Sequence, residues 1–159
     1  KVLEKLNNFN FLEDIYIAKI IPSSINVNLS KTPILGKTFI NGEKFYIGKN
    51  GKFINSNQLY ETSDTASVFG DFEVNEYLNF LTILNDHNLD IKNVEQYYFY
   101  KNKRWDILFS NGHTLMLPSK NLDEAVQFYR GLLDNNYLKN TKIIDLRVTN
   151  QIILKNNNE

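Results

Sequence analysis

The feature that most constrains the fold is the stretch RWDILFSNGHTLMLP, which spans residues 104–118 and holds an Asn-Gly pair. Asn111 and Gly112 both tolerate the positive φ of a two-residue hairpin turn, and strand-like runs flank them. The stretch therefore predicts two antiparallel strands, Arg104 to Ser110 and His113 to Leu117. Two earlier Asn-Gly pairs, at 41–42 and 50–51, also predict hairpin turns. A sheet built from hairpins could serve as a wall of a catalytic pocket or as a surface that holds another protein.

The composition supports one folded domain, or one domain with a small piece of another. Of the 159 residues, 42% are hydrophobic and 13% are aromatic. The formal net charge is zero, with 18 basic and 18 acidic side chains, whereas a nucleic-acid binder usually concentrates positive charge on one face. We therefore expect no nucleic-acid partner. The absence of cysteine excludes disulfides, thiolate metal sites and a cysteine nucleophile.

The first 31 residues predict a helix and two strands. Residues 1–8 carry apolar side chains at helical spacing, and strand-like runs follow from Ile15 to Ile21 and from Ile25 to Leu29. These elements are too few to close a core, so they form the tail of a small α/β domain or extend the next one. The chain opens without Met and has no run of about 20 apolar residues, so we expect a fragment of a longer polypeptide.

The rest of the chain predicts an α+β fold, a mostly antiparallel sheet with two helices on one face. Besides the hairpin, short strands are expected at 39–40, 44–47, 52–54, 94–101, 142–148 and 151–155, and residues 55–69 are expected to form an irregular loop. The first helix would span 72–87 and bury Val74, Tyr77, Leu78, Leu81 and Leu84. The second would start from Asn121 as N-cap, with Glu124 completing a capping box, end near Asp134, and bury Leu122, Val126, Tyr129 and Leu133.

No residue pattern indicates catalysis or a cofactor. His87 and His113 lack partners at metal-ligand spacing, so we interpret both as solvent-exposed and expect no metal site. The chain has no G-x-S-x-G elbow, dinucleotide fingerprint or phosphate loop. The acidic pairs at 71 and 73 and at 123 and 124 fit helix starts, where carboxylates favour the positive end of the helix dipole.

Two charged clusters stand out, Arg104-Trp105-Asp106 and Asp145-Leu146-Arg147. The structural interpretation is cross-strand ion pairing at the sheet surface, with Trp105 in the core. The functional alternative is a peptidoglycan-binding or peptidoglycan-modifying module that uses Arg104, Asp106 and Asp145. Ion pairing is favoured because exposed pairs are common and no nucleophile accompanies these residues.

Several motifs, in order, resemble the extracytoplasmic β domain of the bacterial cell-division family FtsQ, called DivIB in Gram-positive bacteria. They are the basic-Trp strand with its Asn-Gly hairpin, the helix from Asn121, and the stretch TKIIDLRVTNQIIL. Upstream, IIPSSINVNLSKTPI resembles the segment that leads from the family's POTRA domain into its β domain. GEKFYIGKNGKFI resembles the family's tyrosine-containing hairpin. The similarity covers nearly the whole chain.

The resemblance implies a non-enzymatic divisome scaffold that binds FtsB and FtsL and helps control septal peptidoglycan synthesis, without a cofactor. Residues 1–31 would be the C-terminal half of a POTRA domain, which could bind further divisome proteins, and residues 32–159 the FtsQ-type β domain. One N-terminal helix would anchor the parent protein in the inner membrane, with this fragment in the periplasm or extracytoplasmic space. A generic POTRA-type chaperone is a third possibility.

The family's FtsB contacts, carried over position by position, fall on the last strand pair and on the basic residue before the tryptophan. With the rest of the terminal strand, they give the expected partner-binding residues Arg104, Val148, Asn150, Gln151, Ile152, Ile153, Leu154 and Lys155. Some members have Tyr at the position of Val148, and Gly-Trp at that of Lys155-Asn156. This chain therefore lacks the aromatic anchor of those members.

The terminal strand, Gln151 to Lys155, is expected at an edge of the sheet, with unpaired N–H and C=O groups along one side. Such an edge is a template for β-augmentation, in which a partner adds a strand. Ile152 and Leu154 on one face and Ile153 on the other would add apolar contact. This hypothesis requires that the outer flank of the strand be free.

Overall fold

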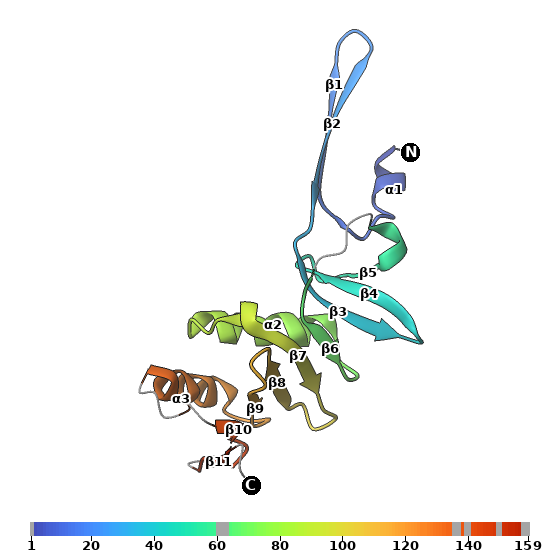
Figure 1. Ribbon diagram of the computed structural model, residues 1–159. Coiled ribbons are helices and arrows are strands. Elements are labelled where there is room, and N and C mark those ends of the chain that lie inside the picture. Colours follow the sequence, from blue (N-terminus) through green and yellow to red (C-terminus); the bar gives the residue numbers. More distant parts are fainter. Residues whose placement is uncertain (1, 60–63, 135–137, 139–140, 149–150, 157–159) are drawn as a thin grey trace. The chain divides into compact units, whose positions relative to one another are not determined.

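In the computed structural model, the chain forms two compact units, Lys1–Thr65 and Ala66–Glu159. The structure describes residues 2–59, 64–134, 138, 141–148 and 151–156 (Figure 1).

The first unit contains a long antiparallel hairpin and a three-stranded meander (Figure 1). Its elements are α1 (Val2–Leu6), β1 (Leu12–Ile20), β2 (Ser24–Lys31), β3 (Ile34–Ile40), β4 (Glu43–Gly48), β5 (Phe53–Asn55) and the 3₁₀ turn η1 (Ser56–Gln58). β1 pairs with β2, and β4 pairs with both β3 and β5, all antiparallel. Asn41 and Gly42 connect β3 to β4 with φ of 52° and 83°, which is the turn that an Asn-Gly pair favours.

Asn50 holds the base of the β1–β2 hairpin against the meander. Its side-chain nitrogen donates hydrogen bonds to the backbone oxygens of Asn10 and Leu12, at 2.9 and 3.2 Å. The side chain of Asn10 in turn donates to the backbone oxygen of Phe53 at 2.9 Å. These side chains give hydrogen-bond partners to backbone oxygens that strand pairing, in the β1–β2 hairpin or in the meander, does not satisfy.

The second unit is a six-stranded sheet with two helices. Its elements are β6 (Ser67–Phe69), α2 (Val74–Asp86), η2 (Ile91–Asn93), β7 (Val94–Phe99), β8 (Trp105–Phe109), β9 (Thr114–Met116), α3 (Leu122–Asp134), β10 (Thr141–Asp145) and β11 (Ile153–Asn156). The strands follow the order β11-β10-β9-β8-β7-β6. The β6–β7 and β9–β10 pairs are parallel, and the other pairs are antiparallel.

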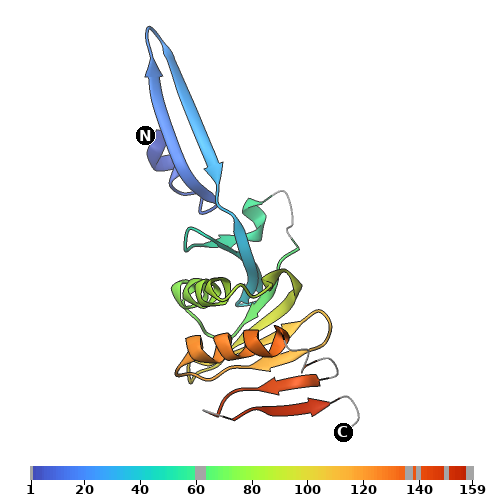
Figure 2. The same cartoon turned by 90° about the vertical axis from the view of Figure 1, so that its left-hand side faces the viewer.

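Both helices cover the same face of this sheet (Figure 2). A row of paired residues on that face is almost fully buried: Val68, Tyr97, Ile107, Leu115 and Ile144. Phe80 of α2 stacks on Trp105 with 4.7 Å between ring centroids, and Tyr129 of α3 stacks on Phe109 at 6.2 Å. The predicted α+β class, with two helices on one face of a mostly antiparallel sheet, is confirmed.

The predicted hairpin, its strands and both long helices are present, with ends that differ by a few residues. In the turn of that hairpin only Gly112, with φ of 83°, has the positive φ that was expected of both Asn111 and Gly112. The predicted loop at 55–69 is wrong in part, because Ser67–Phe69 forms β6 and buries Val68 completely. A strand of three residues is too short for periodicity to reveal, and its pairing with β7 comes from tertiary structure.

The predicted burial of the helices also needs correction. Phe80 is buried although it was not on the expected face, and Leu78 is only half-buried. Leu133 was expected in the core but is 40% exposed. α3 does begin directly after Asn121, whose φ of 54° is a left-handed conformation that asparagine tolerates.

Candidate functional site: the β10–β11 edge

β11 is the outermost strand of the sheet in the second unit. It pairs with β10 in antiparallel register, with Asp145 opposite Ile153 and Ile144 opposite Leu154. Among the described residues no strand pairs with its other flank. Within these residues, the outer flank of β11 is free of strand pairing. The predicted strand was Gln151 to Lys155, but Gln151 and Ile152 precede β11 instead of belonging to it.

Side chains of β11 alternate between the two faces of the sheet. Leu154 extends the buried row that runs through Ile144, yet it is 41% exposed because no strand lies beyond it. Ile153 extends the row on the opposite, helix-free face and is 46% exposed. Every residue of β11 is exposed. The edge thus presents apolar side chains on both faces beside its backbone, as a strand-accepting surface requires.

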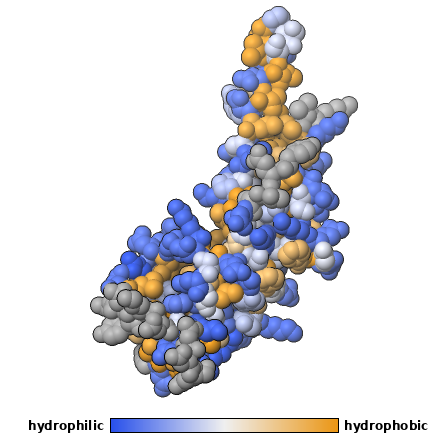
Figure 3. Space-filling view, in the orientation of Figure 1, coloured by the Kyte–Doolittle hydropathy of each residue, from blue (hydrophilic) through white to orange (hydrophobic). Residues whose placement is uncertain are grey.

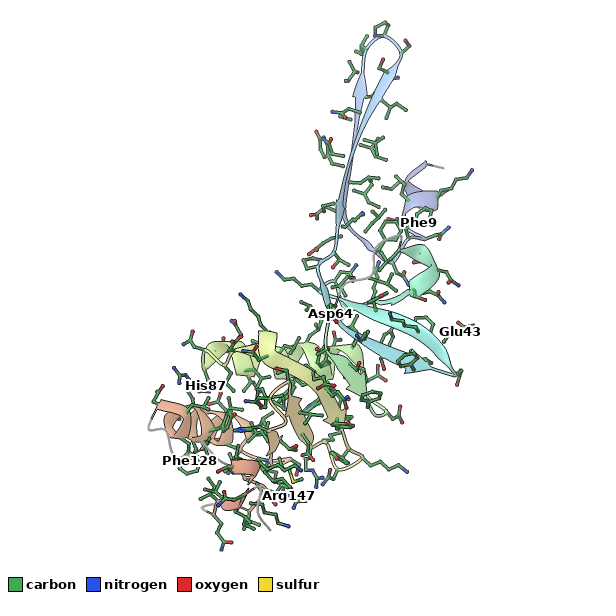
Figure 4. The ribbon with its side chains drawn as sticks, viewed as in Figure 1. Phe9, Glu43, Asp64, His87, Phe128 and Arg147 are labelled. Carbon is green, nitrogen blue, oxygen red and sulfur yellow. The ribbon has the colours of Figure 1, made fainter. Side chains whose placement is uncertain are left out.

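A groove of about 520 Å³ lies between α3 and the segment that joins β10 to β11. Its apolar lining consists of Pro118, Ala125, Phe128, Leu146, Val148 and Ile152, and its polar lining of Lys120, Asn121, Glu124 and Gln151. Phe128 and Val148 are each 50% exposed. Figure 4 shows Phe128 projecting from α3. The groove therefore places exposed apolar surface next to the start of β11.

On the helix-free face, Arg104 is held by two neighbours. Its Nε lies 3.3 Å from Oδ1 of Asp106, and its guanidinium lies over the ring of Tyr100 at 4.1 Å. Asp106 is 3% exposed, and this burial raises the pKa of its carboxyl, while Arg104 acts in the opposite direction. Arg104 therefore compensates a carboxylate that the sheet removes from water.

Arg147 and Asp145 form a second pair at the end of β10 (Figure 4). Arg147 donates to both carboxylate oxygens, from Nε at 2.8 Å and from Nη2 at 2.5 Å. This bidentate contact lowers the pKa of Asp145 and raises that of Arg147. Asp106 and Asp145 are both register partners of Met116, so the two ion pairs lie on the same face of β8 and β10, the two strands that flank β9.

The clusters named from the sequence are therefore ion pairs, and Trp105 is a core residue at 4% exposure. The expected cross-strand pairing is wrong, because each arginine pairs with an aspartate two residues away in its own segment. Both carboxylates are buried and engaged with arginine, which leaves neither as a free acid or base. The structure supports the ion-pair interpretation over the peptidoglycan-modifying one.

Seven of the eight predicted partner-binding residues lie within the described structure. Ile153, Leu154 and Lys155 lie on β11, and Val148, Gln151 and Ile152 line the groove. Arg104 precedes β8, three strands from β11, on the helix-free face. Asn150 lies outside the described residues.

Sequence reasoning missed two residues of this surface. Arg147 belonged to a cluster that the sequence singled out, and its position two residues after Asp145 was the available signal. Phe128 had no signal, because only the packing of α3 decides which of its apolar residues stays uncovered.

The histidines were predicted to be solvent-exposed, and that prediction is wrong. Both are half-buried: Nε2 of His87 lies 3.0 Å from Oδ1 of Asp123, and His113 lines a cavity of about 530 Å³ with Tyr129 and Leu138.

Within the described residues, no group of three or more His, Asp or Glu side chains could hold a metal ion. In the same residues, no helix is long and apolar enough to cross a membrane.

The fold and site are those of an α+β domain with an unpaired sheet edge. The sequence model of the family "Cell division protein FtsQ/DivIB, C-terminal" matches residues 39–147. The chain belongs to this family of bacterial cell-division proteins. The matched range ends before Val148, so of the predicted partner-binding residues only Arg104 lies inside it.

The relatives agree with this assignment. The cell division protein FtsQ of Rickettsia bellii is 24% identical over 98% of this chain and 58% of its own length. FtsQ of Rhizobium radiobacter is 26% identical over 95% of this chain and 73% of its own. The major extracytoplasmic domain of DivIB from Geobacillus stearothermophilus has a TM-score of 0.41 and 12% identity, covering 67% of this chain and 98% of that one. The chain thus spans less than two thirds of the Rickettsia relative.

Proposed function

We propose that this chain is the extracytoplasmic part of a non-enzymatic divisome scaffold, which receives a strand of a partner protein at the outer flank of β11. The partners would be FtsB and FtsL, and their binding would help control septal peptidoglycan synthesis. One N-terminal helix would anchor the parent protein in the inner membrane. The observation that carries the proposal is the position of β11 at the sheet edge.

Backbone pairing alone would give weak binding. Each main-chain hydrogen bond contributes about 0.5–1.5 kcal/mol net, and β11 has only 4 residues. Apolar contact must supply the rest, and Ile153, Leu154 and the groove beside Phe128 offer it. Lys155 would pair with an acidic side chain of the partner, and Arg104 would present a guanidinium that Asp106 and Tyr100 already hold in place.

We further propose that residues 1–31 are the C-terminal half of a POTRA domain and residues 32–159 the β domain. The support is the amphipathic β1–β2 hairpin. One face pairs Ile15 with Leu29, Ile17 with Val27 and Lys19 with Ile25, and the β2 members of these pairs are 39–61% exposed. Figure 3 shows hydrophobic surface along this hairpin. An apolar face of this kind normally lies against another element of its own domain.

The edge hypothesis is tested by substitution in β11. Ile153→Pro, or deletion of Gln151 to Lys155, should abolish binding of the FtsB extracytoplasmic segment in titration calorimetry. The physical reason is that proline removes a backbone donor and deletion removes the template strand. Circular dichroism and Trp105 fluorescence should show that the remainder stays folded.

The matched control is Phe39→Ala, because Phe39 is 55% exposed on β3, in the first unit. This variant should bind FtsB with unchanged affinity. Unchanged affinity in the β11 variants would instead count against the proposal. Turnover of muropeptides by the purified chain would favour an enzyme, and unselective binding of unstructured peptides would favour a chaperone.

A further inference from the structure

The chain contains three Asn-Gly pairs, at 41–42, 50–51 and 111–112, and each lies in a turn. Asn-Gly is chemically reactive because glycine has no Cβ to shield the preceding side chain. The backbone nitrogen of glycine can attack Cγ of asparagine, forming a cyclic succinimide as the Cγ–Nδ2 bond breaks. The proton from the backbone nitrogen leaves with ammonia. Water then opens the ring at either carbonyl, giving aspartate or isoaspartate.

The structure distinguishes the three pairs by how their reacting groups are held. At 50–51, the Asn50 amide donates to two backbone oxygens, and its Oδ1 accepts from the backbone nitrogen of Lys52 at 3.2 Å. The backbone nitrogen of Gly51 donates to Gly48 at 3.1 Å. The electrophile and the nucleophile of this pair are therefore both engaged, and Asn50 is half-buried.

At 111–112 the reacting groups are also engaged, although the turn is exposed. Oδ1 of Asn111 accepts from the backbone nitrogen of His113 at 3.1 Å. The backbone nitrogen of Gly112 donates to the carbonyl of Phe109 at 2.9 Å. Attack by this nitrogen first requires that its hydrogen bond open.

At 41–42 neither reacting group is held. Within the described residues, the Asn41 carboxamide and the Gly42 backbone nitrogen make no hydrogen bond. Asn41 is exposed, and nothing lies within 4 Å of the position a Cβ would take on Gly42. We propose that Asn41 is a site of spontaneous deamidation, and that the fold protects the other two Asn-Gly pairs.

Conversion would alter the tip of the β3–β4 hairpin. Aspartate would add a negative charge two residues from Glu43, which Figure 4 labels at this hairpin. Isoaspartate would lengthen the backbone of a two-residue turn whose flanking residues, Ile40 and Glu43, are paired. Hairpin register depends on loop length, so this product would strain the end of the β3–β4 pairing.

The test is to incubate the folded chain at mildly alkaline pH and follow each site by peptide mapping with mass spectrometry. Digestion at mildly acidic pH with two proteases prevents conversion during handling. We expect Asn41 to convert about fivefold or more faster than Asn111, because one or two hydrogen bonds must open before Asn111 reacts. Asn50 should be the slowest site.

The matched control is the same incubation in denaturant, where the three pairs should convert at similar rates because the fold no longer differs between them. Asn41→Gln should remove the fast product in the folded chain without changing the other two rates. The proposal is overturned if Asn50 or Asn111 converts as fast as Asn41 in the folded chain. It is equally overturned if denaturant leaves the ranking unchanged.

Discussion

Two aspartates on the same face of the sheet have opposite pKa directions, although each lies beside an arginine. Asp106 has a raised pKa because burial outweighs Arg104, whereas Asp145 has a lowered pKa because two hydrogen bonds from Arg147 outweigh burial. The difference arises both from burial, which dominates at Asp106, and from contact geometry, which dominates at Asp145. Arg147 makes a bidentate contact, while Arg104 meets Asp106 at 3.3 and 3.5 Å.

Arg147→Ala should lower the free energy of unfolding by about 1–2 kcal/mol at neutral pH, because Asp145 loses its bidentate donor. The expected loss of stability is small because the Arg147 side chain is 41% exposed, so water can replace part of its contact with Asp145. Asp145 has a lowered folded pKa, so its stabilisation is present above its unfolded pKa and is lost as pH falls through the folded value. The difference between variant and parent should therefore shrink in acid.

Urea denaturation at several pH values measures this effect. The matched control is Arg130→Ala, which removes an exposed pair with Asp134 on α3 and should cost about 0.5 kcal/mol or less. Equal costs for the two variants would show that the Arg147 contact has no special role.

Gly70→Ala should be strongly destabilising, by about 3 kcal/mol or more, because two effects add. Gly70 has φ of 117°, and a Cβ there would collide with the backbone oxygen of Phe99 and lie 2.9 Å from its carbonyl carbon. Gly112→Ala is the control, since φ is 83° but nothing lies within 4 Å, so only about 1–2 kcal/mol of backbone strain is expected. Thermal unfolding followed by circular dichroism gives both values. Similar losses of stability in the two variants would mean that the backbone of Phe99 moves away from the added Cβ.

At the scale of elements, α2 is attached to the sheet by aromatic packing. Phe80 stacks on Trp105 and meets Tyr97 edge to face at 5.9 Å, and Tyr77 contacts both rings. Burial raises the pKa of Tyr77 and of Tyr97, as expected for hydroxyls removed from water. α3 contributes less aromatic packing and keeps Phe128 exposed.

Phe80→Ala should therefore cost about 3–5 kcal/mol, because it leaves a cavity against Trp105. Phe128→Ala makes the same chemical change on an exposed helix face and should change stability by less than about 1 kcal/mol. Trp105 is the only tryptophan, so its fluorescence during urea unfolding reports the second unit directly. A small effect of Phe80→Ala would contradict the assigned packing of α2.

At the scale of the whole molecule, the β1–β2 hairpin carries an exposed apolar row. Ile25, Val27 and Leu29 form an apolar row with few covering side chains within the described residues. The chain also spans only 58% of the Rickettsia bellii relative. These observations support the proposal that residues 1–31 need further polypeptide to complete their domain.

We therefore expect this chain to self-associate at high concentration through the hairpin, because an exposed apolar row favours contact between copies. Replacing Ile25, Val27 and Leu29 by Ser or Thr should shift the sedimentation profile toward monomer. The same substitutions on polar positions of the opposite face, Asn26 and Asn28, are the control. Association that persists in the apolar-row variant would place the contact elsewhere.

The sequence by itself determined the local elements of this protein. Asn-Gly chemistry located the β3–β4, β4–β5 and β8–β9 hairpins, and helical periodicity located α2 and α3, because these signals depend on residues close along the chain. Tertiary structure alone decided that Ser67–Phe69 is a strand and that Phe80 is buried while Leu133 is not. It also decided that β11 ends the sheet, because an edge is defined by which strand lacks a neighbour and not by any property of its own residues.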